Sequence, residues 1–403
     1  MRNAPETARF SLLDSDKADM GYCADMRKKT PKQILSSFKK VGARVETRGR
    51  VKIKKMSDLS LYYTPGVGIA SEHLAAHPED AKNLSVKKNS VAVISDGSAV
   101  LGLGNIGPYG ALPVMEGKAL IFKEFAGIDA WPIVLDTQDP DEIVRTVLAI
   151  APGWGGINLE DIAAPQCFEI ERRINDALPI PVMHDDQHGT AIVVLAGLIN
   201  AAKVAKKTFK NLRVVVSGAG AAGHAVSMLL GAAGITDIVV LDRKGAIHSN
   251  RKDLPPHKKE LALLNTHKRE GTLADVLVDA DVFIGLSGKG LLGIEEVRTM
   301  APRSIVFAMA NPIPEIMPDE AKAAGALVIA TGRSDFPNQI NNALVFPGVF
   351  RGALDHNVRR ITQDMKLKAA RSLAALVKSP TAVKIIPDIF DTRVVPTIAK
   401  AIR

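Results

Sequence analysis

The sequence has few cysteines, few aromatic residues and no apolar run of membrane-spanning length. Its two cysteines, Cys23 and Cys167, are too few for a disulfide framework and form no CxxC pair of the kind that holds zinc. Apolar runs such as TAIVVLAGLI fall short of the roughly 20 residues that a bilayer requires. The N-terminal stretch MRNAPETARFSLLDSDKADM lacks the continuous apolar core of a secretory signal. We therefore expect a cytoplasmic protein without a membrane partner.

Acidic residues are scarce in one segment, and this scarcity accounts for the net charge of +9. Between Arg27 and Lys55, twelve lysines and arginines accompany a single acid, Glu46, whereas the rest of the chain is slightly acidic. A solvated basic surface, or a surface against a subunit partner, explains such a run more readily than a nucleic-acid site. We expect no nucleic-acid partner. A nucleic-acid binder would show steeply salt-dependent binding and no turnover.

The length and the pattern of apolar runs predict two α/β domains. A chain of 403 residues exceeds the size at which one hydrophobic core stops growing. From residue 91 apolar runs alternate with turn signals, in SVAVISDGS, KALIFKEFAG, DAWPIVLDT and DEIVRTVLAIAPGWGGINLED. We predict an N-terminal α/β domain over residues 1–189, of which residues 1–30 are weakly ordered or form a helical arm.

The second half predicts a doubly wound parallel sheet of the Rossmann type. A helix-like segment, TAIVVLAGLINAAKVAKK, precedes the apolar runs LRVVVSG, DIVVLD, DVFIGLSG, SIVFAMA and ALVIATG, which have helix-length segments between them. Buried parallel strands have continuous β-branched runs of this kind. We assign residues 190–403 to this domain.

A glycine-rich turn in the second domain predicts a dinucleotide site. In RVVVSGAGAAGHAV the pattern GxGxxG follows a predicted strand and opens a predicted helix. Such glycines permit a tight turn and a close approach of the backbone to a pyrophosphate, and the helix N-terminus supplies amide donors. The candidate cofactor-binding residues here are Gly218, Gly220, Ala221, Ala222 and Gly223.

The choice between NAD and NADP depends on Asp242, which ends the next predicted strand nineteen residues after Gly223. A carboxylate at this place accepts hydrogen bonds from the adenosine ribose and repels a 2′-phosphate. The adjacent Arg243 and Lys244 would favour that phosphate. We expect NAD, with NADP as the alternative.

Acidic residues in two segments are candidate metal ligands. Glu160 and Asp161 lie in GINLEDIAAPQCF, and Asp185 and Asp186 lie in MHDDQHGT. Oxygen ligands without cysteine partners suit Mg²⁺ or Mn²⁺ better than zinc. The structural alternatives are that Asp186 caps the following helix and that Glu160 and Asp161 form an exposed turn.

Two histidines flank these aspartates, but we do not count them as ligands. An isolated histidine is more often a structural residue with satisfied hydrogen bonds than a metal ligand. His184 and His188 are therefore left out of the predicted metal set.

Several motifs together resemble the malic enzymes, specifically the compact prokaryotic type. The matching text covers roughly residues 58–352 in the family's order: SLYYTPGVG, LGLGNIGPYGALPVMEGKALIFKEFAGIDAWPIVLDT, NLEDI, MHDDQHGTA, SGAGAAG, AMANPIPE and ATGRSDFPNQINNALVFPG. The resemblance departs at Ala99, where larger eukaryotic members carry an arginine that binds a substrate carboxylate. The chain also ends before the phosphotransacetylase-like domain of bifunctional bacterial relatives.

The resemblance implies a role for each matching residue. Tyr63 matches the general acid, Lys118 the general base, and Asp185 a carboxylate beside that catalytic lysine. Asn311 and Asn342 match residues that contact the substrate, and Asn311 also lies near the nicotinamide. The implied metal ligands are Glu160, Asp161 and Asp186.

The implied reaction is the oxidative decarboxylation of L-malate to pyruvate and carbon dioxide, with NAD(P) and Mg²⁺ or Mn²⁺, in a homo-oligomer, by resemblance a dimer. Two alternatives stay open. A malolactic enzyme would produce lactate without net reduction of NAD. An amino-acid dehydrogenase would need ammonia and no divalent metal, which the three acids argue against.

Overall fold

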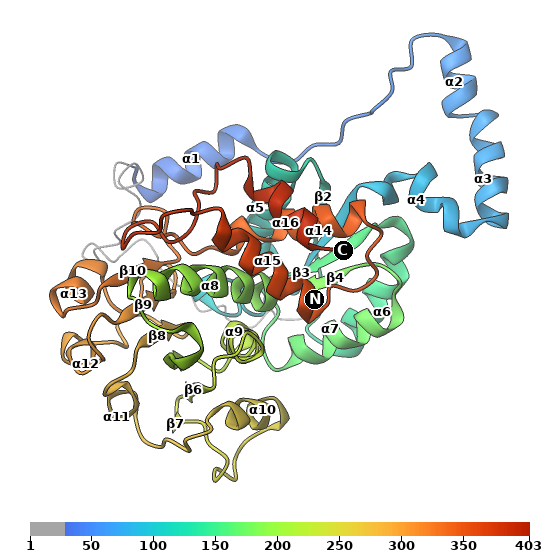
Figure 1. Ribbon diagram of the computed structural model, residues 1–403. Coiled ribbons are helices and arrows are strands. Elements are labelled where there is room, and N and C mark those ends of the chain that lie inside the picture. Colours follow the sequence, from blue (N-terminus) through green and yellow to red (C-terminus); the bar gives the residue numbers. More distant parts are fainter. Residues whose placement is uncertain (1–28) are drawn as a thin grey trace, which may run out of the picture.

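The computed structural model describes residues 29–403, which form two parallel sheets joined by one long helix (Figure 1). The expectation for residues 1–30 falls almost wholly outside the described residues, as does Cys23. Within residues 29–403, no helix has the length and apolar character needed to cross a membrane. The predicted α/β fold class, with a parallel nucleotide-binding sheet, is confirmed.

The first sheet has four parallel strands in the order β2-β1-β3-β4. The central strand β1 is buried along its whole length, as its continuous apolar sequence predicts. Its strands are β1 (Ser90–Ser95), β2 (Asp129–Val134), β3 (Gly156–Leu159) and β4 (Val182–His184). The helices along the same stretch are α5 (Gly107–Ala126), α6 (Pro140–Ile150) and α7 (Gln166–Ala177). The apolar run at 118–127 is therefore the end of α5 and not a strand.

The second sheet has six strands in the order β10-β9-β8-β5-β6-β7. All five predicted apolar runs are parallel strands, and only the short β7 pairs antiparallel. The strands are β5 (Arg213–Ser217), β6 (Asp237–Asp242), β7 (Gly245–Ala246), β8 (Val282–Gly285), β9 (Ile305–Ala308) and β10 (Val328–Thr331). The helices between them are α9 (Ala221–Ala232), α10 (Pro256–Leu264), α11 (Leu273–Leu277), α12 (Ile294–Arg298) and α13 (Pro318–Ala323).

Helix α8 (Asp185–Val204) begins at the last strand of the first sheet and runs to the second sheet, where it packs on α9. The predicted boundary at residue 189 falls inside its first turns and stays a prediction. The C-terminal helices α14 (Phe346–Asp355), α15 (Gln363–Ala375) and α16 (Val394–Ala401) close the fold. Helix α14 also packs on α5, where the Phe122 and Phe346 ring centroids are 4.7 Å apart. The two sheets thus share one continuous core.

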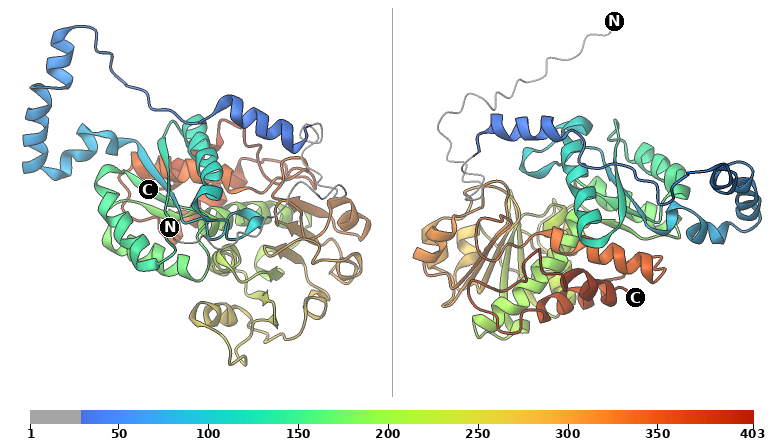
Figure 2. Two further views of the ribbon diagram at one scale, coloured as in Figure 1. Left: turned by 180° about the vertical axis from the view of Figure 1, so that it is seen from behind. Right: turned by 90° about the horizontal axis from the view of Figure 1, so that it is seen from above.

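The segment before the first sheet forms an arm that stands away from the body (Figures 1 and 2). Its helices are α1 (Pro31–Val41), which lies along the body, then α2 (Met56–Tyr62), α3 (Gly66–Ala76) and α4 (Ala81–Leu84). None of these four helices contains a buried residue. Apolar side chains such as Met56 and Ile69, each 75% exposed, leave the arm without a core of its own.

Candidate active site

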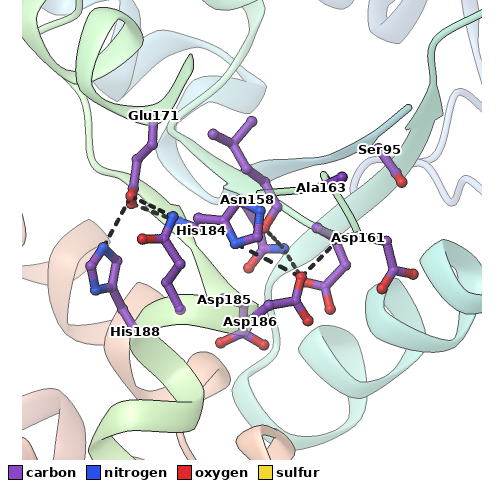
Figure 3. Close-up of polar contacts among 12 residues, drawn as sticks. Ser95, Asn158, Asp161, Ala163, Glu171, His184, Asp185, Asp186 and His188 are labelled. Carbon is purple, nitrogen blue, oxygen red and sulfur yellow. Dashed lines mark hydrogen bonds and ion pairs between the residues drawn. The ribbon is translucent and has the colours of Figure 1, made fainter. Parts of the chain in front are cut away.

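The acidic residues predicted from the sequence meet at one edge of the first sheet. Glu160 and Asp161 directly follow β3, and Asp185 and Asp186 directly follow β4. Because β3 and β4 are parallel neighbours, their carboxyl ends bring the four side chains to the same edge of the sheet. Figure 3 shows Asp161, Asp185 and Asp186 there.

Three of these carboxylates form a cluster fitted to a divalent cation. One oxygen from each of Glu160, Asp161 and Asp186 lies within 4.8 Å of the other two. Asp161 Oδ2 is buried and has no hydrogen-bond partner among the described residues. A buried, unpaired carboxylate oxygen is costly unless a cation compensates it. The donor set is purely oxygen, which fits Mg²⁺ or Mn²⁺.

The structural alternatives for these acids are wrong. Glu160 and Asp161 are each only 3% exposed, so they do not form an exposed turn. Asp186 Oδ2 accepts a hydrogen bond from the Asp161 amide at 2.8 Å, and α8 has no side-chain cap at its N-terminus. Asp186 is therefore directed toward the other two acids.

Burial and the charge of neighbouring carboxylates favour the protonated form of Glu160 and Asp161. Burial and the nearby charge of Asp186 raise the pKa of Glu160 well above its usual value. Burial, again with Asp186, raises the pKa of Asp161 to about 7. Crowded like charges in a dry environment favour protonation. A doubly charged ion would compensate the same charges.

Lys118 projects from α5 into this cluster. Its Nζ lies 2.5 Å from Asp185 Oδ2 and 2.5 Å from Glu160 Oε1, and 4.4 Å from the centre of the Phe346 ring. Burial lowers the pKa of Lys118, but the carboxylates of Asp185 and Glu160 outweigh burial and raise it. The predicted pairing of Asp185 with the lysine is thus present.

The glycine-rich turn joins β5 to α9 as predicted. Gly218 has φ +117°, a conformation that favours glycine, and a Cβ on Gly223 would lie 1.8 Å from the Gly218 oxygen. At Gly220, which precedes α9, a Cβ would meet nothing within 4 Å. This open side leaves room for a phosphate near the amides of Ala221 and Ala222, at the start of the helix.

Comparison with known proteins identifies both halves of this arrangement. Residues 43–175 match the family described as malic enzyme, N-terminal domain, and residues 187–402 match malic enzyme, NAD binding domain. The chain belongs to the malic enzyme family. The family predicted from the motifs, and with it an oxidoreductase that has an NAD(P)-binding domain, is confirmed.

Curated malic enzymes are similar over most of their length. The chain is 53% identical to an NAD-dependent malic enzyme of Geobacillus stearothermophilus over 365 residues, covering 90% of this chain and 76% of that protein. It is 52% identical to a bifunctional malic/malolactic enzyme of Bacillus subtilis, with 89% and 88% covered. A crystal structure of the NAD-dependent malic enzyme of Thermotoga maritima has a TM-score of 0.88 at 44% identity, covering 91% of this chain and 98% of that one.

In this malic enzyme the two predicted substrate residues lie on different segments of the nucleotide domain. A Cβ on Gly189 would lie 1.8 Å from Asp185 Oδ1 and 3.2 Å from the Asn342 Cβ, so Asn342 is a neighbour of Asp185. Asn311 follows β9 in the nucleotide domain. A Cβ on Gly102 would lie 2.1 Å from the Asn311 backbone oxygen, so this loop contacts the first domain.

Asp242 lies at the end of β6, as predicted, but its carboxylate already has four donors. Oδ1 accepts from the Lys244 amide and Arg251 Nη1, both at 2.9 Å. Oδ2 accepts from Arg251 Nη2 at 3.1 Å and Lys258 Nζ at 2.7 Å. Burial raises the pKa of Asp242, but these donors outweigh burial and lower it to about 2. The cations come from the loop after β7 and from α10, and residue spacing does not predict that these segments lie beside Asp242.

Tyr63 is not near the cluster. It ends α2 on the arm and is 63% exposed, whereas Lys118 is 7% exposed inside the body. Figure 1 shows α2 at the far end of the arm. The role of Tyr63 stays a prediction, and a single chain does not bring it to Lys118.

Sequence analysis missed two buried residues that hold the cluster. Asn158 Nδ2 donates to Glu160 Oε2 at 3.0 Å. Glu171, on α7, contacts the start of α8. One signal was present, because Glu171 occupies a buried position of α7 together with Cys167, Ile170 and Ile174. The three-acid group that could hold a metal ion does not include His184 or His188, and their exclusion as ligands stays a prediction.

Proposed function

We propose that this chain oxidatively decarboxylates L-malate to pyruvate and carbon dioxide, with Mg²⁺ or Mn²⁺ held by Glu160, Asp161 and Asp186. The observation that carries the proposal is the convergence of these carboxylates beside the Lys118–Asp185 pair. A bound divalent cation supplies Lewis-acid chemistry at the substrate oxygens.

Lys118 is the group that takes the C2 hydroxyl proton. It must first be neutral, although its carboxylate neighbours raise its pKa. A cation that compensates the charges of Glu160 and Asp186 would weaken their effect on the pKa of Lys118. Burial would then favour the neutral amine. Asp185 then fixes the direction of the amine.

A bound dinucleotide would supply the acceptor for the hydride on C2 of malate. The glycine-rich turn would hold the dinucleotide pyrophosphate. Asn311 would contact both the nicotinamide and the substrate, and Asn342 would contact the substrate beside Asp185. Tyr63 would protonate C3 of enolpyruvate.

A second copy of the chain would bring Tyr63 to the site, so we propose a homodimer. Apolar side chains on α2 and α3, such as Leu61 at 62% and Ile69 at 75% exposure, have no cover within the described chain. An apolar surface of this kind on a projecting arm is typical of a subunit contact.

Mixing two inactive variants tests this arrangement. If Tyr63 acts across the dimer, Lys118→Ala and Tyr63→Phe subunits refolded together recover about a quarter of wild-type activity, because half of the dimers then hold one intact site. If Tyr63 acts within its own chain, every site keeps one defect and no activity returns. A monomer in sedimentation would contradict the dimer itself.

For the cofactor, the contacts of Asp242 favour NADP over the expected NAD. A carboxylate that already accepts four hydrogen bonds has little capacity for a ribose diol. Arg251 and Lys258 would instead bind a 2′-phosphate. Comparable kcat/KM with both nucleotides would contradict this choice.

The central measurement is the formation of pyruvate and reduced cofactor from L-malate, with Mn²⁺ and after thorough chelation. Full turnover without a divalent ion would contradict the metal site. Lactate without net cofactor reduction would instead indicate a malolactic enzyme, an alternative supported by the name of the Bacillus subtilis relative. A cytoplasmic location stays a prediction of the sequence.

A further inference from the structure

Glu171 is a buried carboxylate whose hydrogen bonds all go to the segment that carries the aspartates. It lies on α7 and is 8% exposed. Its Oε1 accepts from the His184 amide at 2.8 Å, and its Oε2 contacts Gln187 Nε2 at 3.2 Å and His188 Nε2 at 3.0 Å (Figure 3). These partners flank Asp185 and Asp186 on both sides.

The start of α8 depends on this contact because it has no cap of its own. No side chain at its N-terminus caps the helix. The first amides of a helix lack partners within the helix, and an anion near them is stabilised by the helix dipole. Glu171 supplies an acceptor and a negative charge to this segment from a neighbouring helix.

The network is fixed at its outer end by a third segment. Lys366 Nζ, on α15, lies 3.1 Å from His188 Nδ1. Because Lys366 can only donate, Nδ1 accepts, and His188 Nε2–H donates to Glu171. Burial raises the pKa of Glu171, but the contacts with His188 and His184 outweigh burial and lower it to about 2. The carboxylate is therefore charged at neutral pH.

We propose that Glu171 is a positioning residue for the metal ligand Asp186. It fixes the backbone at His184, whose ring Nδ1 lies 3.8 Å from Asp186 Oδ2, and the turn that follows. The orientation of Asp186 toward Asp161 is thereby set before any cation binds. This inference rests on the metal site proposed above. Groups behind a ligand commonly change metal affinity when they are replaced.

Glu171→Gln tests the proposal because it keeps the volume and removes the charge. In either orientation the amide nitrogen of the new side chain would face a donor, the His184 amide or Gln187 and His188, so at least one hydrogen bond to the start of α8 is lost. We expect Mn²⁺ affinity to fall by about tenfold or more, measured as free Mn²⁺ by electron paramagnetic resonance without substrate. Glu169→Gln is the matched control, since Glu169 lies on the same helix with its side chain 58% exposed.

Two further results decide between positioning and simple packing. Glu171→Asp keeps the charge and should recover part of the lost Mn²⁺ affinity. If Glu171→Gln melts at a lower temperature but binds Mn²⁺ as Glu169→Gln does, the proposal is wrong. If Glu171→Gln does not fold, Glu171→Asp must bind Mn²⁺ more weakly than wild type for the proposal to stand. Absence of Mn²⁺ binding by the wild type would contradict the proposed function instead.

Discussion

The two halves of the site use the carboxyl edge of a parallel sheet in different ways. At the first sheet, buried charges are placed against one another, and Glu160, Asp161 and Asp186 converge within 4.8 Å. At the second sheet, Gly218 and Gly223 shape the backbone around an open space, and Gly220 leaves it clear. The first half should therefore respond to changes of charge, and the second to added atoms.

The largest expected effect is the loss of one charge at the first edge. Asp186→Asn keeps the shape of the side chain but removes the charge that would bind the cation, so we expect turnover to fall on the order of a thousandfold. Asp176→Asn, at the end of α7 with its side chain 51% exposed, is the control and should match wild type. Steady-state kinetics with saturating Mn²⁺ measures both variants. Equal rates for Asp186→Asn and Asp176→Asn would contradict the role of charge at the first sheet.

The second edge should respond to one methyl group. Gly223→Ala would place a Cβ 1.8 Å from the Gly218 oxygen, so the turn must move. We expect affinity for the dinucleotide to fall about tenfold to hundredfold, together with a lower melting temperature. Gly220→Ala meets no protein atom within 4 Å and should weaken dinucleotide binding at unchanged stability. Calorimetry and thermal melting measure the two quantities, and identical behaviour of both variants would contradict this reading of the turn.

A change of pH should affect the first edge more than the second. The pKa of Asp161, raised to about 7 by burial and by Asp186, means that a proton competes with the cation. As pH falls from 8 to 6 the protonated fraction rises, so Mn²⁺ affinity should drop by about tenfold, with proton release on binding at pH 6. Dinucleotide affinity, measured at the same two pH values, should change less.

The smallest expected effect concerns the cations around Asp242 at the second sheet, which the proposed function assigns to a 2′-phosphate. Lys258→Ala removes one cation from Asp242. Loss of one charge-assisted contact to a 2′-phosphate should lower kcat/KM for NADP by several-fold to about tenfold and leave that for NAD unchanged or improved. Lys252→Ala, in the loop that precedes α10, serves as the control. An equal loss with both nucleotides would place Lys258 away from the ribose.

Local sequence patterns predicted the strands of the second sheet and the glycine-rich turn. Contacts between segments far apart in the sequence were predicted less well. The five parallel strands of the second sheet and the GxGxxG turn are encoded in short stretches, so both were predicted, whereas the short antiparallel β7 was not. The acids were found as oxygen donors in two short segments, and the structure adds that these segments directly follow strands that lie side by side. Lys118 was identified by resemblance alone, since one lysine within a helix gives no sign that Asp185 lies opposite.

Two contacts between distant segments were not predicted, and the role of Tyr63 stays a prediction. The loop that carries Arg251 folds back onto Asp242, and residue spacing alone does not predict this contact. Tyr63 was assigned to the site by resemblance, although the arm holds it apart from Lys118 within one chain. Glu171 escaped notice because its partners belong to another helix.

Helix α8 has a consequence for motion. It begins with Asp185 and Asp186 and ends among the helices of the nucleotide domain, with Asn200 hydrogen-bonded to the carbonyl oxygens of Ala374 and Ile385. A hinge movement between the two domains would therefore rotate α8 and displace Asp185 and Asp186 with it. Separation of the two domains for nucleotide exchange would then also weaken the binding of a cation at the proposed site.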